Sequence, residues 1–478
     1  MKVLKSIFCI LIIYSLPLSG QYNSAVPGFI RDSLDQYVVK AMADWQIPGM
    51  AVGIVKNGKI IALKGYGKLS MSGVQRVDEN SLFMIGSNTK AFTATALAML
   101  AELKKCSLND KVIKWIPEFK MKDAWVTKEV NLTDLLCHRI GMDGYQGDFV
   151  YWASNLTVKQ VIEKFGRFEP AFSFRSKYGY TNAGFVIAGE CISRISGESW
   201  AQFLKSNLYE PLRMNRTQAL SVEYSKQDNA TAAHTMRNDS LIEIPIENID
   251  NINAAGSMGS SVSDMCHWLI CQLDSGRYDG KQVIPYSVIE KTRVPQTVVG
   301  NYSRPFNTAH FALYGLGWRL VDYEGKEVIA HAGAVDGFHS TVCLIPEIGL
   351  GIVILTNSDV NDFYDALKWD IIDAYLNLPA RNYSDYYLKK FHEAHSRESA
   401  EIKLWRDSAA LNPASAFKLE KYKGTYVNEV YGKINITNDS KNLEIHFEHH
   451  LILRVISNVL VETGLCVHTQ IPNSGLRS

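Results

Sequence analysis

Apolar residues recur with the period of a β-strand in some segments of the chain and with the period of an α-helix in others. The change from one period to the other divides the chain into predicted strands and helices. Ala51–Val55 and Ile60–Leu63 are apolar and rich in β-branched residues, and Asn57-Gly58 between them is a strong hairpin turn signal. A β-hairpin is therefore predicted over residues 49–67. Strand signals return in three later segments: Glu327–His331, Gly337–Ile345 and Gly349–Thr356.

Between these strand segments, from about residue 83 to 308, the apolar residues recur with the period of a helix. The predicted helices are Ala91–Leu103, Val158–Phe165, Ala183–Ser196, Trp200–Leu208 and Asp264–Leu273, with one more at Phe363–Tyr375. Strands near both ends of a helical block predict one antiparallel sheet with the block beside it. The expected fold class is α/β, of the α+β kind: an antiparallel sheet flanked by helices plus a helical region.

The C-terminal part of the chain follows another pattern. Residues 381–413 are charged and contain several Ser and Ala, and we interpret them as a linker. Beyond them, apolar residues alternate in Ile434/Ile436 and in Leu443/Ile445/Phe447 around a polar turn, which predicts a second β-hairpin. The expected domains are a signal peptide (1–20), a main domain (21–380), the linker (381–413) and a small β-domain (414–478).

Length and charge limit the possible functions. The chain has 478 residues, of which 46% are hydrophobic and 21% charged, as in ordinary globular proteins. Its formal net charge is +1, so no overall field favours nucleic acid, and we expect a small-molecule or peptide substrate and no nucleic-acid partner.

The N-terminus has the order of a secretory signal peptide. Lys2 and Lys5 precede the almost wholly apolar segment Ser6–Leu18, and the small residues Ser19 and Gly20 follow. The alternative is a membrane anchor, but the apolar run is short for a bilayer. We expect cleavage near Gly20, a periplasmic or secreted protein, and no stable membrane insertion after cleavage.

The cysteines and histidines do not predict a metal site. Seven cysteines follow the signal segment with wide, irregular spacing, mostly in apolar surroundings, and we expect small buried side chains. They are Cys106, Cys137, Cys191, Cys266, Cys271, Cys343 and Cys466. His392-Glu393-Ala394-His395 lacks further ligands and lies in a charged segment, which favours a solvated helix. We expect no metal and no cofactor.

Ser87-Asn88-Thr89-Lys90 follows Gly86 and opens a predicted helix. Ser87 and Lys90, three residues apart, lie on one helical face. A serine hydroxyl needs a base to become a good nucleophile, and a desolvated lysine with a lowered pKa can be that base. The free N–H groups at the helix start suit a developing oxyanion.

Two further segments carry suitable chemistry. In Tyr180-Thr181-Asn182 the phenol can relay a proton and the amide can hold a substrate carbonyl. His331-Ala332-Gly333 is predicted at the end of a strand, where Gly333 would let a substrate backbone approach. The N–H of Ala334 could then pair with that of Ser87 as an oxyanion hole.

Together, in this order, these three elements resemble the penicillin-binding protein and class C β-lactamase superfamily, in the branch that includes D-alanyl-D-alanine carboxypeptidases, esterases and D-aminopeptidases. The resemblance covers roughly residues 25–378 and includes further segments. These are Leu135–Gly141, Tyr180–Gly189 with Ser196-Gly197, Glu210–Met214, Gly256–Met265 and His331–Thr356. It implies the β-lactamase/DD-peptidase fold, and the C-terminal part is similar to a partial lipocalin-like β-domain.

The resemblance implies a role for each site residue. Ser87 would be the nucleophile, Lys90 its base and Tyr180 the proton relay. The expected substrate-binding residues are Asn182, His331, Gly333 and Ala334. Typical β-lactamases carry Lys-Thr-Gly where this chain has His331-Ala332-Gly333. The resemblance therefore implies an acyl-enzyme serine hydrolase of the peptidase, esterase or weak β-lactamase type.

Two alternatives to this function are an α/β-hydrolase and a catalytically inactive binding protein. An α/β-hydrolase needs Gly-x-Ser-x-Gly after a strand, and the sequence has no such pattern. The remaining alternative is a catalytically inactive binding protein on the same scaffold. The intact set of motif residues favours the enzyme.

Overall fold

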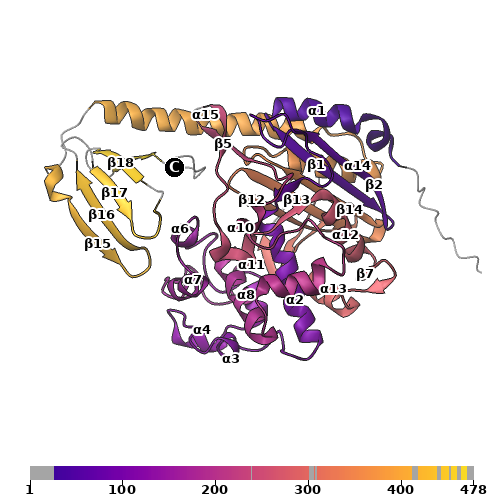
Figure 1. Cartoon of the computed structure of the whole chain (residues 1–478), viewed down its shortest axis with the longest axis horizontal. Coiled ribbons are helices and arrows are strands. Elements are labelled where there is room, and N and C mark those ends of the chain that lie inside the picture. The colour runs from indigo at the N-terminus through magenta and orange to yellow at the C-terminus, as the bar shows by residue number, and fades with distance from the viewer. Residues whose placement is uncertain are drawn as a thin grey trace, which may run out of the picture.

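The architecture is seen in a computed structural model that describes residues 26–237, 239–300, 306, 309–411, 418–438, 443–451, 454–459 and 465–470. A helical region lies below a large sheet, and a small sheet lies to one side (Figure 1). The predicted signal peptide falls outside the described residues. Within those residues no helix has the length and apolar character needed to cross a membrane.

An eight-stranded antiparallel sheet forms the centre of the main domain, as predicted. Its strand order is β2-β1-β14-β13-β12-β11-β10-β9, and each neighbouring pair is antiparallel. The predicted hairpin and the predicted closing strands are confirmed. The strands are β1 (Gly49–Lys56), β2 (Lys59–Gly67), β9 (Thr297–Gly300), β10 (Ala312–Tyr314), β11 (Arg319–Tyr323), β12 (Lys326–Val335), β13 (Phe338–Ile345) and β14 (Leu350–Thr356).

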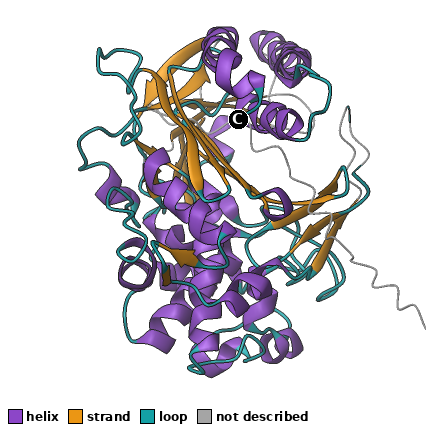
Figure 2. Ribbon diagram, turned by 90° about the vertical axis from the view of Figure 1, so that its right-hand side faces the viewer, coloured by secondary structure: helices purple, strands orange, loops and turns teal. Residues whose placement is uncertain are grey.

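Helices cover both faces of this sheet (Figure 2). Val52 and Ile54 of β1 belong to an apolar cluster with residues of α1 (Leu34–Asp44) and α14 (Phe363–Tyr375). Ala51 and Val55 point the opposite way, into a larger cluster shared with the helical region. The central strands read as continuous apolar runs because both of their faces are buried.

The helical region is built around α2 (Thr89–Glu102), in which every residue from Thr89 to Leu100 is buried. The predicted helices are present, and α7 and α14 begin and end at the predicted residues. The other helices are α3 (Val112–Trp115), α4 (Ala124–Glu129), α5 (Leu132–Leu136), α6 (Asp148–Tyr151), α7 (Val158–Phe165), α8 (Asn182–Ser196), α9 (Trp200–Leu204), α10 (Ser221–Tyr224), α11 (Asn253–Gly256), α12 (Val262–Leu273) and α13 (Tyr286–Arg293).

Short strands and turns join these elements. β3 (Leu82–Met84) pairs with β6 (Gly259–Ser261) and leads directly into the segment that contains Ser87. The other short strands are β4 (Ala233–Arg237), β5 (Ser240–Ile244), β7 (Arg277–Tyr278) and β8 (Lys281–Gln282). The short helical turns are η1 (Phe29–Ser33), η2 (Gly86–Asn88), η3 (Lys205–Tyr209), η4 (Asp250–Ile252), η5 (Pro346–Ile348) and η6 (Leu419–Lys421).

Most of the segment interpreted as a linker, residues 381–413, forms one long helix, α15 (Tyr383–Ala410). The interpretation of this segment as a linker relied on its charge, but its many Lys, Glu, Arg and Ala residues are good helix formers. The helix is anchored at its first turns, where the indole of Trp45 donates to Ser384 Oγ at 3.0 Å and stacks obliquely on Phe391. It runs from the main domain towards the small sheet (Figure 1).

The small C-terminal domain contains a five-stranded antiparallel sheet in the order β15-β16-β17-β18-β19. The predicted hairpin is formed by β16 and β17. Two strands follow His450, where the sequence alternation fades. The strands are β15 (Gly424–Asn428), β16 (Gly432–Asn438), β17 (Leu443–Phe447), β18 (Arg454–Val459) and β19 (Leu465–Gln470).

Candidate active site

Ser87 lies where a short strand turns into the buried helix α2. Gly86, just before it, has φ of +52°, and a Cβ atom there would lie 2.8 Å from the backbone nitrogen of Ala334. Glycine is therefore required twice, for the left-handed backbone and for the close approach of β12. This contact places the start of α2 beside β12, as the oxyanion-hole prediction for Ser87 and Ala334 requires.

Lys90 is completely buried, one helical turn beyond Ser87. Its ammonium nitrogen lies 2.9 Å from Ser87 Oγ, 2.7 Å from Asn182 Oδ1 and 2.8 Å from the carbonyl oxygen of Ala255. Burial lowers the pKa of Lys90 to about 7, against a smaller opposing effect of the Asp148 charge. Once deprotonated, the amine can donate to the amide and carbonyl oxygens and leave its lone pair towards Ser87.

Tyr180 closes the other side of Ser87. Its phenol interacts with Ser87, and Lys90 Nζ lies 4.8 Å from the centre of its ring. Burial raises the pKa of Tyr180 well above its ordinary value, so the phenol is protonated at neutral pH. A protonated phenol between the serine and the lysine can pass a proton in either direction.

Asn182, the first residue of α8, is held at both ends of its amide. Its Oδ1 accepts from Lys90, and its Nδ2 donates to Asp148 Oδ2 at 2.7 Å. Burial raises the pKa of Asp148 to about 6. Asn182 also lines the cavity in front of Ser87. The predicted contact of Asn182 with a substrate stays a prediction. Within the protein, the Asn182 amide orients Lys90.

His331 differs from its prediction in position and in hydrogen bonding. It lies within β12, which continues to Val335, and not at the strand end. Its Nδ1 donates to the Ala332 carbonyl at 2.6 Å, and its Nε2 accepts from the Tyr314 hydroxyl at 2.9 Å. Burial lowers the pKa of His331 to about 3, so the ring is neutral and does not titrate between pH 5 and 9. Both ring nitrogens are engaged within the protein.

Gly333 and Ala334 lie on a stretch of β12 with a free edge. β11 pairs with β12 only as far as Ala330, so the following residues are paired on the β13 side alone. A Cβ atom on Gly333 would lie 1.9 Å from the carbonyl oxygen of Ile85. The glycine is therefore required by the packing beneath Ser87, and its role in the approach of a substrate stays a prediction.

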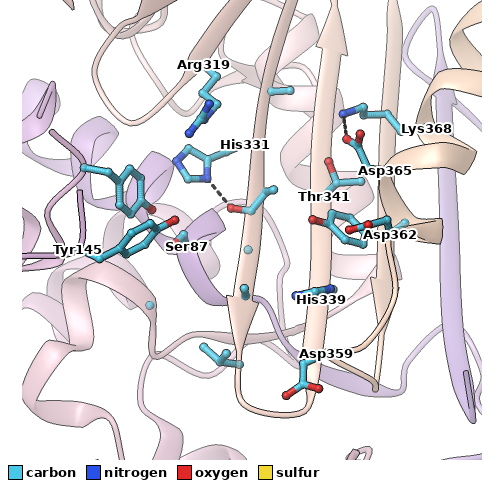
Figure 3. A pocket seen from close by; sticks show the side chains of 18 of the residues that line it. Ser87, Tyr145, Arg319, His331, His339, Thr341, Asp359, Asp362, Asp365 and Lys368 are labelled. Atoms are coloured by element: carbon cyan, nitrogen blue, oxygen red, sulfur yellow. Dashed lines mark hydrogen bonds and ion pairs between the residues drawn. The ribbon is translucent and has the colours of Figure 1, made fainter. Parts of the chain in front are cut away.

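Arg319, on β11, is a cation that sequence reasoning missed. It lines the same cavity as Ser87, close to His331 (Figure 3). Its guanidinium contacts the Tyr178 hydroxyl at 3.5 Å and pairs with no carboxylate in the described part of the chain. Nearby Arg175 and Lys177 do not reach the cavity: Arg175 pairs with Asp134 at 2.7 Å, and Lys177 lies over the Phe172 ring.

His138, which the sequence placed only in a family-like segment, supports the Tyr180–Asn182 turn. It is fully buried with φ of +60°, and its Nδ1 accepts the backbone N–H of Thr181 at 3.1 Å. Burial lowers the pKa of His138 well below its ordinary value, so this acceptor is retained at neutral pH.

We expect His138→Leu to lower kcat about tenfold, because an unpaired buried N–H at Thr181 costs roughly 1–3 kcal/mol and loosens the turn. His138→Asn should lose less, because asparagine tolerates positive φ and its carbonyl can accept. Ester turnover and urea unfolding of both variants check this. Equal losses for both variants would show that ring volume, not the acceptor, matters.

The predicted site residues converge on one cavity of about 1350 Å³. Lys90 lies beneath Ser87, and the other six predicted residues line the cavity: Ser87, Tyr180, Asn182, His331, Gly333 and Ala334. The cavity continues past β12 to α14 and α15 (Figure 3). Among the described residues, no group of three or more His, Cys, Asp or Glu side chains is arranged to hold a metal ion.

The chain is similar to a known protein family and to several known proteins. The Beta-lactamase family model matches residues 34–377. "Unguisins hydrolase ungD" of Aspergillus violaceofuscus is 26% identical over 468 residues, covering 90% of this chain and 80% of that protein. "Protein flp" of Staphylococcus aureus is 26% identical over 330 residues, covering 68% of this chain and 63% of that protein.

Solved structures share the fold. The octameric penicillin-binding protein homologue from Pyrococcus abyssi has a TM-score of 0.62 at 21% identity, covering 92% of this chain and 93% of its own. A D-stereospecific amidohydrolase from Streptomyces has a TM-score of 0.58 at 22% identity, covering 71% of this chain and 96% of its own. These likenesses agree with the predicted fold class.

Proposed function

Because the chain belongs to the Beta-lactamase family, we propose that it is a serine hydrolase that cleaves an amide or ester bond through an acyl-enzyme on Ser87. The observation that carries the proposal is the buried amine of Lys90, 2.9 Å from Ser87 Oγ, with a pKa lowered to about 7. A buried lysine with this pKa is poised as a general base.

In the proposed acylation, the Lys90 amine takes the Ser87 proton while Ser87 Oγ attacks the carbonyl carbon of the substrate. The N–H groups of Ser87 and Ala334 face the developing oxyanion. Tyr180 then passes a proton from Lys90 to the leaving nitrogen or oxygen as its bond to the carbonyl breaks. Deacylation reverses the proton path: water attacks the ester carbonyl, its proton passes through Tyr180 to Lys90, and Lys90 returns a proton to Ser87 Oγ as the bond between Oγ and the carbonyl carbon breaks and the acid product leaves.

The test is mass spectrometry of the protein after reaction with a fluorophosphonate and, separately, with a slowly hydrolysed ester. The adduct is expected on the peptide that contains Ser87, while the exposed-serine variant Ser107→Ala should label like the wild type. An adduct on another residue contradicts the assignment. Absence of any adduct favours the alternative, a catalytically inactive binding protein.

Arg319 bears on the substrate class. Because His331 replaces the lysine of typical β-lactamases, the sequence favours poor discrimination between substrates with and without a carboxylate. His331 is neutral and internally bonded, whereas the Arg319 guanidinium faces the cavity. We therefore propose that substrates with a carboxylate are accepted and that Arg319 binds it.

We expect Arg319→Gln to lower kcat/KM for a carboxylate-bearing substrate by roughly 10- to 100-fold, because a hydrogen bond to a charged group contributes about 1.5–3 kcal/mol. A neutral p-nitrophenyl ester should change no more than about threefold. The measurement is the ratio of kcat/KM for a cephalosporin and the neutral ester in both proteins. An unchanged ratio excludes Arg319 as the carboxylate anchor.

A further inference from the structure

The C-terminal β-domain touches the main domain beside the cavity, on the segment that carries α6. The His450 ring stacks on Phe149, with ring centres 4.7 Å apart, and Phe149 itself lines the cavity. The backbone N–H of Asn155, just after α6, donates to the His449 carbonyl at 3.0 Å. The small domain therefore holds one wall of the cavity.

His450 is itself an anchored side chain. Only 5% of its surface is exposed, and its ring lies against the backbone of Phe149 and Ala153. These two residues lie within and just after α6, so one histidine ties the helix and the turn that follows it. The neighbouring His449 ring contacts Asn155 Oδ1 at 3.0 Å.

α6 has little stability of its own. It contains four residues, no side chain caps its N-terminus, and it begins after Gly147 at φ of +94°. A helix this short is not stable in isolation, so its position depends on tertiary contacts. The contacts with His449 and His450 are of this kind.

The first residue of α6 is connected to the proposed base. Asp148 Oδ2 accepts from Asn182 Nδ2 at 2.7 Å, and Asn182 Oδ1 accepts from Lys90 at 2.7 Å. The other carboxylate oxygen accepts from the Tyr151 hydroxyl. Because Asp148 can only accept when ionised, it fixes the amide so that oxygen, not nitrogen, faces Lys90.

We propose that the His449–His450 segment of the C-terminal β-domain positions Lys90 through α6, with Asp148 as the positioning residue that orients Asn182. This inference rests on the proposed function, since Lys90 must be the base of Ser87. The small domain is then part of what keeps the site active, and not only an appended module.

Asp148 also acts on Lys90 through its charge. The titratable groups around Lys90 are Asp148 from α6, Tyr180 before α8, His138 after α5, and His331 on β12, with Arg319 beyond it. Burial keeps both histidines neutral and Tyr180 protonated. Above its own pKa of about 6, the Asp148 carboxylate therefore favours the charged lysine, and its removal should lower the lysine pKa.

Two substitutions separate the charge of Asp148 from its orienting role. Asp148→Asn keeps an acceptor for Asn182, so the acid limb of the kcat/KM profile should shift down by roughly 0.5–1 pH unit while the plateau changes less than about threefold. Asp148→Ala releases the Asn182 amide and should lower the plateau about tenfold or more.

The interdomain step is tested with His450→Ala, His450→Phe and the exposed control His446→Ala in the full chain. The measured quantity is the rate of Ser87 acylation by a fluorophosphonate across pH 5–9, with thermal unfolding in parallel. We expect about a tenfold loss and a downward shift of the acid limb for His450→Ala, a smaller loss for His450→Phe, and wild-type rates for the control. In the double variant, His450→Ala should lower the acylation rate of Asp148→Ala by less than about a further twofold, because both residues act through the same contact.

The outcomes are distinguishable. If wild-type Ser87 is not acylated, the proposed function fails. If the wild type is acylated, and both His450 variants match it in rate and in acid limb, the positioning role is overturned. A lower unfolding temperature with an unchanged rate would overturn it as well, because it shows a structural contact alone. If His450→Ala does not fold, His450→Phe decides.

Discussion

Replacing Ser87 with alanine is expected to lower kcat/KM for a p-nitrophenyl ester by roughly 10⁴-fold or more. The variant lacks the oxygen that forms the acyl-enzyme, while the buried amine of Lys90 and the N–H groups near Ala334 are retained. The small side chain fits without strain, so the unfolding temperature should change little. Steady-state ester hydrolysis and thermal unfolding are the measurements.

The control is Ser107→Ala, in which an exposed serine that does not line the cavity is removed. It should hydrolyse the ester at the wild-type rate. Turnover of Ser87→Ala above about one hundredth of the wild-type value would assign the chemistry to another nucleophile.

Replacing Lys90 with arginine is the second large effect, with an expected loss of roughly 10²–10⁴-fold in kcat/KM. Arginine keeps its proton at any accessible pH and cannot take one from Ser87.

The reaction rate of the wild type should depend on pH in the direction set by the pKa of Lys90. Lys90 is protonated below its pKa of about 7, so the rate should fall as the pH decreases through 7 and reach a plateau above it.

Lys128→Arg, on the exposed surface of α4, is the matched control and should leave the rate unchanged. A double variant of Ser87→Ala and Lys90→Arg should be no slower than Ser87→Ala alone, because the two residues act as one unit. A flat wild-type profile from pH 5 to 9 would contradict a lysine base. His331, with a pKa of about 3, does not contribute in this range.

Much of the fold was accessible from local patterns. The hairpin at Asn57-Gly58, the helices α7 and α14, and the turn with Ser87 that leads into α2 each depend on neighbouring residues in the chain. The sequence did not predict the helix α15, because its charged composition is typical of both a helix and a linker. The charged residues of α15 suit a solvated helix as well as a linker, and docking of Phe391 on Trp45 anchors the helix.

By itself the sequence determined which residues could do the chemistry: Ser87 with Lys90 on one helical face, Tyr180 with Asn182 at a helix start, and the strand with His331. These pairs are near neighbours, so their spacing encodes their geometry. Only the tertiary structure decided how each group is tuned. Asp148 and Asn182 lie 34 positions apart in the chain, and Ser87 and Arg319 lie on separate elements. Burial and long-range contacts set the lysine pKa, engage both nitrogens of His331 and join the C-terminal domain to α6, and none of these leaves a local pattern in the sequence.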